Sequence, residues 1–547
     1  MTPHRPPPGA TTRRVATDSV VGSAWIMVSR ATGLVRIVAV AAVLGPTQFA
    51  DLYQAANTVP NLLFELLVGA LFASLLVPAV VRHVDAGDPV AAARLASRFL
   101  TLAVGTAVVL TLAVVLAGPW VVGLLRAGIP EGERAVPGGS AWLLLALLLV
   151  QVPLYMVVGV AAAVQQASGR FALAAGAPSV ENVAITVVLG AYTVLFGTGR
   201  AGEHGTAEIL LLGGGTTAAV LAHAAVQWAG ARRCGVRLAL ARGGRRDPEV
   251  RGIVRLAVPS VGHAGLTAAR YFCLLVVAAA VPGGVVAFTV AWAFYMLPSA
   301  VTARPIAQAS LPHLSRAHAA GDEAGYREGF DRGLGLVLFL AVPAAVLYAV
   351  LSGPLATVVA FGEMATPAGR ELLQHCMLGI SLGIVGQAAF DVATPAAYAR
   401  GDAGRPLRAV ALRAVLAVAG MLGSLALLDG PALLLGVGLS IAVSDLVAAA
   451  FLCWAITHPL ARGTSSAVPT LLRTTGAGLA MLPVVLGVRA LAGEVSGRGE
   501  GLLVILLAGG AGALVYGGVQ WALRSPELAG MLALLRGRGA VAGRGHG

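Results

Sequence analysis

Four arginines fall inside long apolar stretches of this 547-residue chain. An arginine keeps its charge in proteins, and near the middle of a membrane it costs about 2.5–3.5 kcal/mol, so it normally faces a partner or a wet cavity. Its planar guanidinium group can bond two oxygens of one phosphate at once. The set therefore predicts a cationic site for an anionic ligand. Its members are Arg30, Arg36, Arg270 and Arg304.

Carboxylates in the same stretches allow a second interpretation. Buried ion pairs are a common answer to the cost of desolvation, so any one arginine can equally be half of a structural salt bridge. The embedded acids are Asp51, Glu65, Glu181, Asp391 and Asp445. Both interpretations stay open for each residue. We expect Asp51, Arg304 and Asp391 to be supporting charges around the site.

The spacing of these residues restricts the geometry of such a site. Arg30 and Arg36 are six residues apart, which on a helix means about 9 Å along the axis and a net rotation of about 240°. They cannot share one narrow helix face. Pro60 and Pro298 lie inside two apolar segments and should bend them, as proline does in moving and in static helices.

Composition indicates the kind of element that must carry these residues. The chain is 57% hydrophobic and 12% charged, whereas soluble domains carry roughly 25% charged residues. A water-soluble fold is therefore excluded, and an all-α polytopic membrane protein is predicted. At about 20 apolar residues per span, we expect fourteen transmembrane helices. They lie near 20–44, 54–81, 99–118, 140–165, 171–197, 207–229, 256–280, 285–312, 333–360, 371–398, 409–428, 431–455, 471–492 and 501–523.

The distribution of arginine along the chain tests this topology. With a cytoplasmic N-terminus, 28 of the 38 basic residues fall in inner segments, Arg413 among them, and 6 in outer loops. Such a bias is what the positive-inside rule requires. We expect both termini to be cytoplasmic. The basic loop 233–255 is interpreted as a solvated surface facing anionic lipid, and nucleic acid is not expected as a partner.

An internal repeat indicates two lobes. Shifting the sequence by 234 residues superimposes Arg36 on Arg270 and repeats the pattern Pro-x3-Arg-x4-Gly-Asp that begins at Pro78 and at Pro312. Parallel repeats of this kind build transporters with a substrate site between two lobes. The predicted organisation is two pseudo-symmetric six-helix lobes plus two C-terminal helices. The boundaries are a cytoplasmic tail 1–17, N-lobe 18–232, basic loop 233–255, C-lobe 256–456, final helix pair 457–525 and cytoplasmic tail 526–547.

Other motifs favour structural roles. Residues 379–383 match the Gly-x-Ser-x-Gly pattern of a nucleophile elbow, but they lie in a predicted helix and equally form the helix-packing pattern Gly-x-x-x-Gly. His223 and His263 are single imidazoles inside helices and are interpreted as core polar groups. The four cysteines are widely scattered, so no zinc site, disulfide framework or cofactor is expected.

Several of these segments together resemble a known family. The matching stretches are residues 29–36 (Ser-Arg-Ala-Thr-Gly-Leu-Val-Arg), 50–51 (Ala-Asp), 57–69 (Asn-Thr-Val-Pro-Asn-Leu-Leu-Phe-Glu-Leu-Leu-Val-Gly) and 77–78 (Val-Pro). They look like the N-terminal signature of the MurJ (MviN) family, in particular its actinobacterial branch. Supporting matches follow at 168–171 with Pro178, at 297–299 with 311–312, and at 396–402, so the resemblance covers roughly 18–525.

The resemblance implies a flippase of the MOP exporter superfamily that moves lipid II, an undecaprenyl-diphosphate-linked peptidoglycan precursor, from the inner to the outer leaflet. It implies a multi-pass protein of the cell membrane, with lipid II and membrane lipids as ligands and cell-wall synthesis proteins as further candidate partners. Arg30, Arg36 and Asp51 fall on motif positions of the family. We expect Arg30, Arg36 and Arg270 to meet the diphosphate.

This chain also departs from the family pattern. Phe64 stands where many relatives have arginine, Gly69 where they have an acid, and Ala293 where they have a further arginine. The seventh and eleventh predicted helices lack the acids that hold sodium in some relatives. The alternatives are therefore another MOP-type exporter, for a polysaccharide repeat unit or drugs, and a membrane-embedded polyprenyl-phosphate enzyme. The short outer loops with few clustered carboxylates disfavour an enzyme.

Overall fold

The computed structural model describes residues 8–68, 75–129, 131–200, 204–458 and 467–535, and these are α-helical with short connections and no strand. Twelve of their helices are long and apolar enough to cross a membrane, or thirteen if the bent pair α17–α18 is one span. The all-helical membrane fold is thus confirmed. The expected span 54–81 falls on α2 and α3 with residues 69–74 outside the described part, so the number fourteen stays a prediction.

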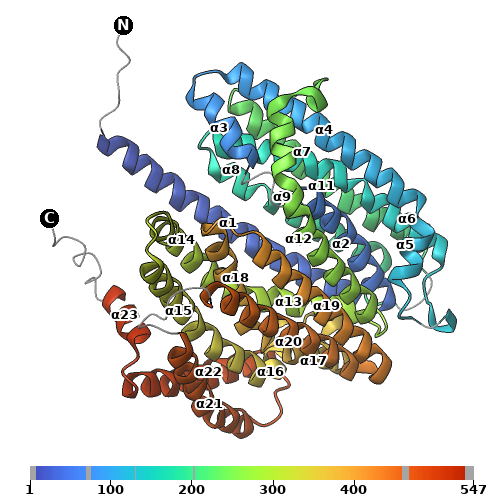
Figure 1. The fold of residues 1–547 in the computed structure, drawn as a ribbon. Coiled ribbons are helices and arrows are strands. Elements are labelled where there is room, and N and C mark those ends of the chain that lie inside the picture. Colours follow the sequence, from blue (N-terminus) through green and yellow to red (C-terminus); the bar gives the residue numbers. More distant parts are fainter. Residues whose placement is uncertain (1–7, 69–74, 130, 201–203, 459–466, 536–547) are drawn as a thin grey trace. The chain divides into compact units, whose positions relative to one another are not determined.

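The first of two compact units comprises residues 1–286 and 361–363. In this unit α1 packs against α8 and α9, α2 against α6, α7 and α12, and α11 against α7 and α9. Its helices are α1 (Pro8–Leu44), α2 (Gln48–Val68), α3 (Val77–Asp85), α4 (Pro89–Leu116), α5 (Gly118–Leu125), α6 (Gly138–Leu149), α7 (Gln151–Ala167), α8 (Phe171–Gly176), α9 (Pro178–Phe196), α10 (Thr206–Ile209), α11 (Gly215–Arg233) and α12 (Pro248–Ala278) (Figure 1).

The second unit comprises residues 287–360 and 364–547. In it α20 packs against α17, α18 and α19, and α15 against α14, α18 and α21. Its helices are α13 (Gly284–Val301, whose first turn belongs to the first unit), α14 (Ala303–Ala319), α15 (Glu323–Val350), α16 (Ser352–Val359), α17 (Pro367–Ile380), α18 (Gly383–Ala399), α19 (Gly404–Leu427), α20 (Gly430–Thr457), α21 (Ala467–Ala492), α22 (Arg498–Ala522) and α23 (Pro526–Leu535).

The division between the units differs from the predicted lobe boundary. α12, expected to open the C-lobe at residue 256, falls in the first unit because it packs on α2, α4 and α5. Packing and internal repetition are different criteria, so the two six-helix lobes stay a prediction. The predicted tails overlap α1 and α23, and residues 1–7 and 536–547 lie outside the described part.

The repeated Pro-x3-Arg-x4-Gly-Asp pattern builds the same turn in both units. Gly87 and Gly321 have φ of 71° and 70°, a left-handed conformation that suits glycine at a helix C-terminus. The following residue, Asp88 or Asp322, caps the next helix, because its Oδ1 accepts a hydrogen bond of 2.8 Å from the N–H three residues on. The sequence repeat therefore has a structural counterpart in the local backbone.

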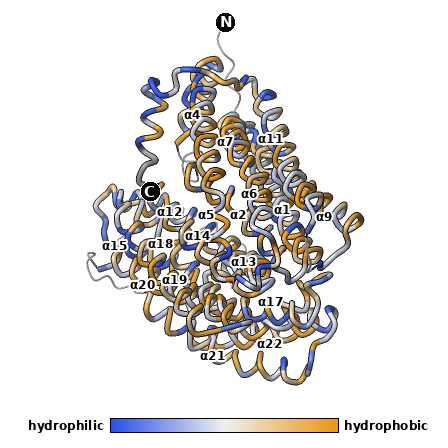
Figure 2. The backbone as a smooth tube through the Cα atoms, turned by 90° about the vertical axis from the view of Figure 1, so that its right-hand side faces the viewer, coloured by the Kyte–Doolittle hydropathy of each residue, from blue (hydrophilic) through white to orange (hydrophobic). Residues whose placement is uncertain are grey.

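The apolar segments behave as expected for helices with lipid as solvent. Figure 2 shows hydrophobic residues along most of the length of the long helices. Many large apolar side chains are exposed, for example Leu116, Val194 and Leu514. In a soluble protein such exposure would indicate an interaction surface. Here it indicates a surface covered by lipid.

The final helix pair is joined to α15 of the second unit by an apolar cluster. Phe339 of α15 packs with Ala477 and Met481 of α21 and with Val504 and Tyr516 of α22. The hydroxyl of Tyr516 donates to the Phe339 carbonyl at 2.7 Å. This buried contact fixes α21 and α22 to α15.

The Gly-x-Ser-x-Gly stretch is a packing motif, with one correction. A Cβ on Gly379 would lie 2.9 Å from the Gly438 Cα, and a Cβ on Gly383 would lie 3.1 Å from the Ala442 Cα, so both glycines let the chain approach α20 closely. The stretch is not inside one helix, however. α17 ends at Ile380 and α18 begins at Gly383, and the two are bent by 48°.

The two prolines predicted to bend helices lie inside helices. Pro60 is within α2 and Pro298 within α13. Pro298 precedes a break at Thr302, after which α14 begins at Ala303. Their role as hinges stays a prediction.

Candidate functional site

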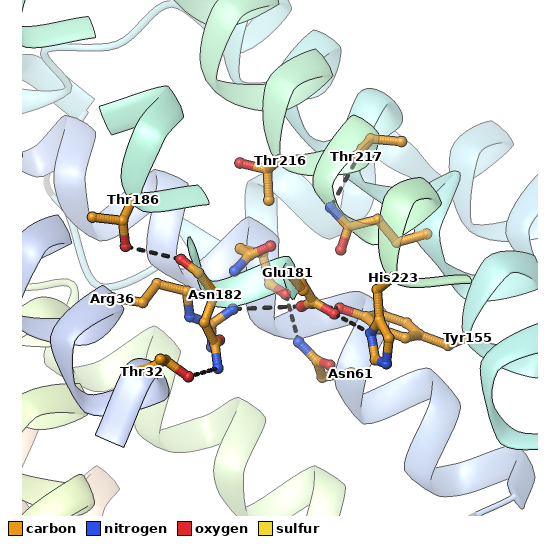
Figure 3. Close-up of polar contacts among 12 residues, drawn as sticks. Thr32, Arg36, Asn61, Tyr155, Glu181, Asn182, Thr186, Thr216, Thr217 and His223 are labelled. Atoms are coloured by element: carbon orange, nitrogen blue, oxygen red, sulfur yellow. Dashed lines mark hydrogen bonds and ion pairs between the residues drawn. The ribbon is translucent and has the colours of Figure 1, made fainter. Parts of the chain in front are cut away.

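Arg36 lies in the polar interior of the first unit and faces a single carboxylate. Its Nη1 is 3.6 Å from Oε1 of Glu181 on α9, and the two side chains are 24% and 10% exposed. Figure 3 shows Glu181 between Arg36 on one side and His223 on the other. The distance is long for a charge-assisted hydrogen bond, which is normally about 2.7–2.9 Å. The pair is therefore loose.

Glu181 has closer partners than Arg36. Nδ1 of His223 on α11 lies 2.8 Å from its Oε2, and the hydroxyl of Tyr155 on α7 donates to its Oε1 at 3.1 Å. These contacts satisfy the buried carboxylate, so the guanidinium of Arg36 keeps most of its donors for another acceptor. His223 is a core polar group as predicted on its Nδ1 side. Its Nε2 is buried and has no hydrogen-bond partner among the described residues.

The contact between α1 and α9 explains why Arg36 points inward. Nδ2 of Asn182 donates to the Ser29 carbonyl and to the Thr32 hydroxyl, both at 3.2 Å. Gly33 allows this approach, since a Cβ there would already lie 3.4 Å from Nδ2 of Asn182. Residues 29, 32, 33 and 36 form one helix face. Arg36 consequently lies on the α9-facing side of α1.

The other two arginines of the predicted diphosphate site are in different surroundings. Arg30 of α1 is exposed. Arg270 of α12 is buried, with 6% of its surface exposed. All three belong to the first unit. A cavity shared by Arg30, Arg36 and Arg270 stays a prediction.

Asp51 has a structural function that the sequence did not indicate. Its Oδ2 accepts a hydrogen bond from the N–H of Gly283 at 2.7 Å, and its Oδ1 accepts one from the N–H of Val286 at 3.0 Å. It thereby caps the first turn of α13, whose N–H groups otherwise lack partners. Gly283 has φ of 84°. The role of Asp51 as a supporting charge stays a prediction.

In the second unit the structure brings together Arg304 and Asp391, which the sequence analysis named only as supporting charges. Nε of Arg304 is 3.7 Å from Oδ2 of Asp391, and the arginine side chain is 51% exposed. The Ser299 hydroxyl donates to the same oxygen at 2.5 Å, and the Gln387 amide donates to Oδ1 at 2.8 Å. Asp391 is thus well satisfied, and Arg304 is held on one side only.

A fifth embedded arginine was missed. Arg413, counted among the inner-segment residues, is buried in α19, with Nε 2.5 Å from Oδ1 of Asp445. The Tyr295 hydroxyl donates to the other oxygen of Asp445 at 2.5 Å, and Arg413 also donates to Gln387. The sequence does indicate this buried pair, because residue 413 lies inside the predicted span 409–428 and an acid lies in the middle of the next predicted helix.

The two interpretations therefore apply to different residues. Arg413 and Asp445 form a buried structural pair, whereas Arg36 and Arg304 are paired loosely and remain partly exposed.

Of the positions that depart from the family pattern, Phe64 packs its ring 5.6 Å from that of Tyr155. Gly69 lies outside the described residues.

Comparison with known proteins gives the family. The model of the family described as lipid II flippase MurJ matches residues 40–508. The chain belongs to this family. A probable lipid II flippase MurJ of Vibrio cholerae is 28% identical over 407 residues, which cover 72% of this chain and 75% of that protein. One of Rhizobium meliloti is 26% identical over 380 residues, 69% of each chain.

Solved structures share the fold of this MurJ family member. A lipid II flippase MurJ in an inward closed conformation superimposes with a TM-score of 0.71 at 16% identity, covering 92% of this chain and all of that one. An inward-facing multidrug resistance MATE transporter of the MOP superfamily gives 0.62 at 18% identity, covering 80% and 98%. At these identities the likeness concerns the fold alone.

Proposed function

We propose that this protein is a lipid II flippase, which moves the undecaprenyl-diphosphate-linked precursor from the inner to the outer leaflet of the cell membrane. Membership of the MurJ family supports this function directly. The relatives in Vibrio cholerae and Rhizobium meliloti are named as probable lipid II flippases. Transport without chemical change of the substrate, rather than an enzymatic reaction, is part of the proposal.

The observation that carries the mechanism is the state of Arg36. It lies inside the helical bundle, is paired at 3.6 Å with a carboxylate that His223 and Tyr155 already satisfy, and keeps a quarter of its side chain exposed. A diphosphate can therefore take Arg36 without leaving Glu181 unpaired. We propose that Arg30, Arg36 and Arg270 bind the diphosphate while the polyprenyl chain stays in lipid.

Alternating access supplies the movement in this proposal. Parallel repeats in related transporter folds rock against each other around a central site. With both termini cytoplasmic, an inside-negative potential favours outward movement of an anion by about 2.3 kcal/mol per charge per 100 mV. The family's cell-wall synthesis machinery is the proposed biological context.

Depletion of the protein in its source organism tests the function. Undecaprenyl-linked precursors are then measured separately in the two leaflets. Accumulation of lipid II in the inner leaflet is the expected result. An unchanged distribution contradicts the proposal and favours another MOP-type exporter, a function that here rests on the fold shared with the MATE transporter.

A further inference from the structure

The basic loop between α11 and α12 is not free in solvent but lies in register along α4. The N–H of Ala239 donates to Oγ of Ser97 at 3.1 Å, and the N–H of Ala241 donates to Oγ1 of Thr101 at 2.8 Å. Four helical residues rise about 6 Å, and two extended residues advance about 6.6 Å. One turn of α4 therefore matches two residues of the extended loop.

The far end of this loop is anchored as firmly. Gly244 packs on the backbone of α4, where a Cβ would lie 2.6 Å from the Arg98 carbonyl oxygen. Asp247 receives a hydrogen bond of 2.7 Å from Nη1 of Arg98, and its other oxygen caps the start of α12. Both oxygens of the Asp247 carboxylate thus already accept hydrogen bonds.

Between these anchors lies an open pocket of about 340 Å³. From α4 the pocket is lined by Leu102, Gly105 and Thr106. From the loop it is lined by Arg242, Arg245 and Arg246. All three arginines are exposed, and none has a carboxylate partner among the described residues. Three arginines at one pocket without a carboxylate partner in the described part of the chain predict an anionic ligand.

An apolar stripe continues from the pocket along the same helix face. Gly105, Val109, Leu112 and Leu116 succeed one another at spacings of three or four residues. The side chains of Val109, Leu112 and Leu116 are 68%, 56% and 83% exposed. From Gly105 to Leu116 the stripe extends about 16 Å. The arginines of the pocket and the apolar stripe are therefore arranged along α4 in the same order as the headgroup and the acyl chains of a phospholipid.

The position along α4 also suits a lipid headgroup. Arg94 and Arg98 occupy the first part of the helix, and a mostly apolar run without any charged residue starts at Phe99. That run has 18 residues up to Leu116, close to the length of a membrane span. The pocket thus lies where the polar and the apolar parts of the helix meet.

We propose that this pocket binds the headgroup of an anionic phospholipid of the leaflet predicted to be cytoplasmic, with an acyl chain along the α4 stripe. Charge complementarity selects an anionic headgroup, and the stripe distinguishes a lipid from free phosphate. The site is formed by the first unit alone and uses none of the residues proposed to bind the transported substrate.

Native mass spectrometry of the full-length protein in detergent tests the site. The protein is titrated with dioleoylphosphatidylglycerol, and bound lipids are counted. We expect R242Q/R245Q/R246Q to lower the affinity about tenfold or more. The matched variant R94Q/R251Q/R255Q removes three exposed arginines outside the pocket. It should change the affinity by less than about threefold.

A second pair of variants tests the pocket without changing charge. A Cβ on Gly105 or on Gly190 of α9 meets nothing within 4 Å. G105L should fill the pocket and abolish tight phosphatidylglycerol binding, while G190L should leave it unchanged. Thermal unfolding of each variant verifies that it is folded.

Three outcomes overturn the proposal. One is equal loss of affinity in both triple variants. Another is equal binding of dioleoylphosphatidylcholine by the wild-type protein, which would mean that the site does not discriminate between headgroups by their charge. The third is displacement of phosphatidylglycerol by inorganic phosphate at equal concentration, which would indicate a site for a soluble anion.

Discussion

Arg36 and Arg413 illustrate two ways in which a membrane protein accommodates an arginine. Arg413 is almost fully buried and its guanidinium meets Asp445 and Gln387. Arg36 has one long contact and a partly exposed side chain. A buried guanidinium held by a carboxylate and an amide is not accessible to a ligand, whereas a loosely held and partly exposed one is. The two residues should therefore respond differently to substitution.

Arg36→Ala should abolish transport, because a diphosphate ligand is lost, and change the free energy of unfolding by no more than about 1 kcal/mol, since the pair is loose and partly exposed. Glu181→Gln should lower transport by roughly tenfold through the position of Arg36. Complementation of a depleted strain and thermal unfolding of the purified variants measure the two effects.

Glu65→Gln is the matched control for the carboxylate, because Glu65 is exposed on α2, and transport should be unchanged. Full activity of Arg36→Ala would show that Arg36 does not bind the substrate. If R36A/E181Q regains the activity that each single variant lost, the pair is a structural salt bridge.

Arg413→Met should destabilise the protein by about 3–5 kcal/mol, because it leaves the carboxylate of Asp445 buried without its cation. The double variant R413M/D445L should be less destabilised than R413M, since both charges are removed. Unfolding midpoints in detergent provide the measurement. Arg304→Gln, at a half-exposed pair, should cost less than about 1 kcal/mol. Additive losses in the double variant would refute the coupling.

Helix ends and connections show how this fold fixes its elements. The turns at Gly87 and Gly321 depend on residues within a few positions of each other, and the capping aspartate follows at once. The start of α12 is capped by Asp247, which also ties the basic loop to Arg98 of α4. One carboxylate thereby stabilises a helix end and a long-range contact.

Docking of this loop should depend on pH. Partial burial opposes ionisation of Asp247, but the hydrogen bonds from Arg98 and from the N–H groups of Val250 and Glu249 outweigh it and hold the pKa of its carboxyl below the usual value. Because the folded-state pKa is the lower one, the stabilisation is complete above the unfolded pKa of about 3.9 and is lost as pH falls through the folded pKa.

Asp247→Asn should weaken docking at neutral pH in the same way. Hydrogen–deuterium exchange at the N–H groups of Ala239 and Ala241, corrected for intrinsic rates, measures the docking of the loop. In D247N this exchange should become several-fold faster. Asp429 is a suitable control, because it precedes α20 without making a side-chain cap. D429N should leave exchange at the start of α20 unchanged. Unaltered protection in D247N would show that Asp247 does not hold the loop.

The excess of arginine in alternate connections predicts the topology of the chain. It predicts that the N-terminal end of α4 and the basic loop lie in the cytoplasm and that the α5–α6 connection lies outside. Gly132 in that connection and Arg94 on α4 are both exposed. They can therefore report the orientation of the chain.

In a variant without native cysteines, G132C should react with a membrane-impermeant maleimide on intact cells and R94C should react only after permeabilisation. G499C, in the first turn of α22 next to a second connection predicted to be outer, should behave as G132C does. Labelling of R94C on intact cells would invert the predicted orientation, and with it the direction of transport. Retained growth complementation by each variant verifies that the protein is folded.

Local properties of the chain could be predicted from its sequence. Hydropathy over about 20 residues indicated the twelve spans found and the bent pair α17–α18, and the Gly-Asp pattern indicated a repeated turn, because both depend on neighbours along the chain. The packing role of Gly379 and Gly383 was also predicted correctly. The break at residues 381–382 between α17 and α18 was not, since no proline or charge marks it.

Partnerships between distant residues depended on the packing of the helices. Asp51 meets Gly283 at a separation of 232 residues, and Arg413 meets Asp445 across α19 and α20. Sequence shows that an embedded charge needs a partner but not which helix face lies opposite it. That choice is made by the contacts between whole helices, such as those of α1 with α9, and these contacts leave Arg36 loosely held.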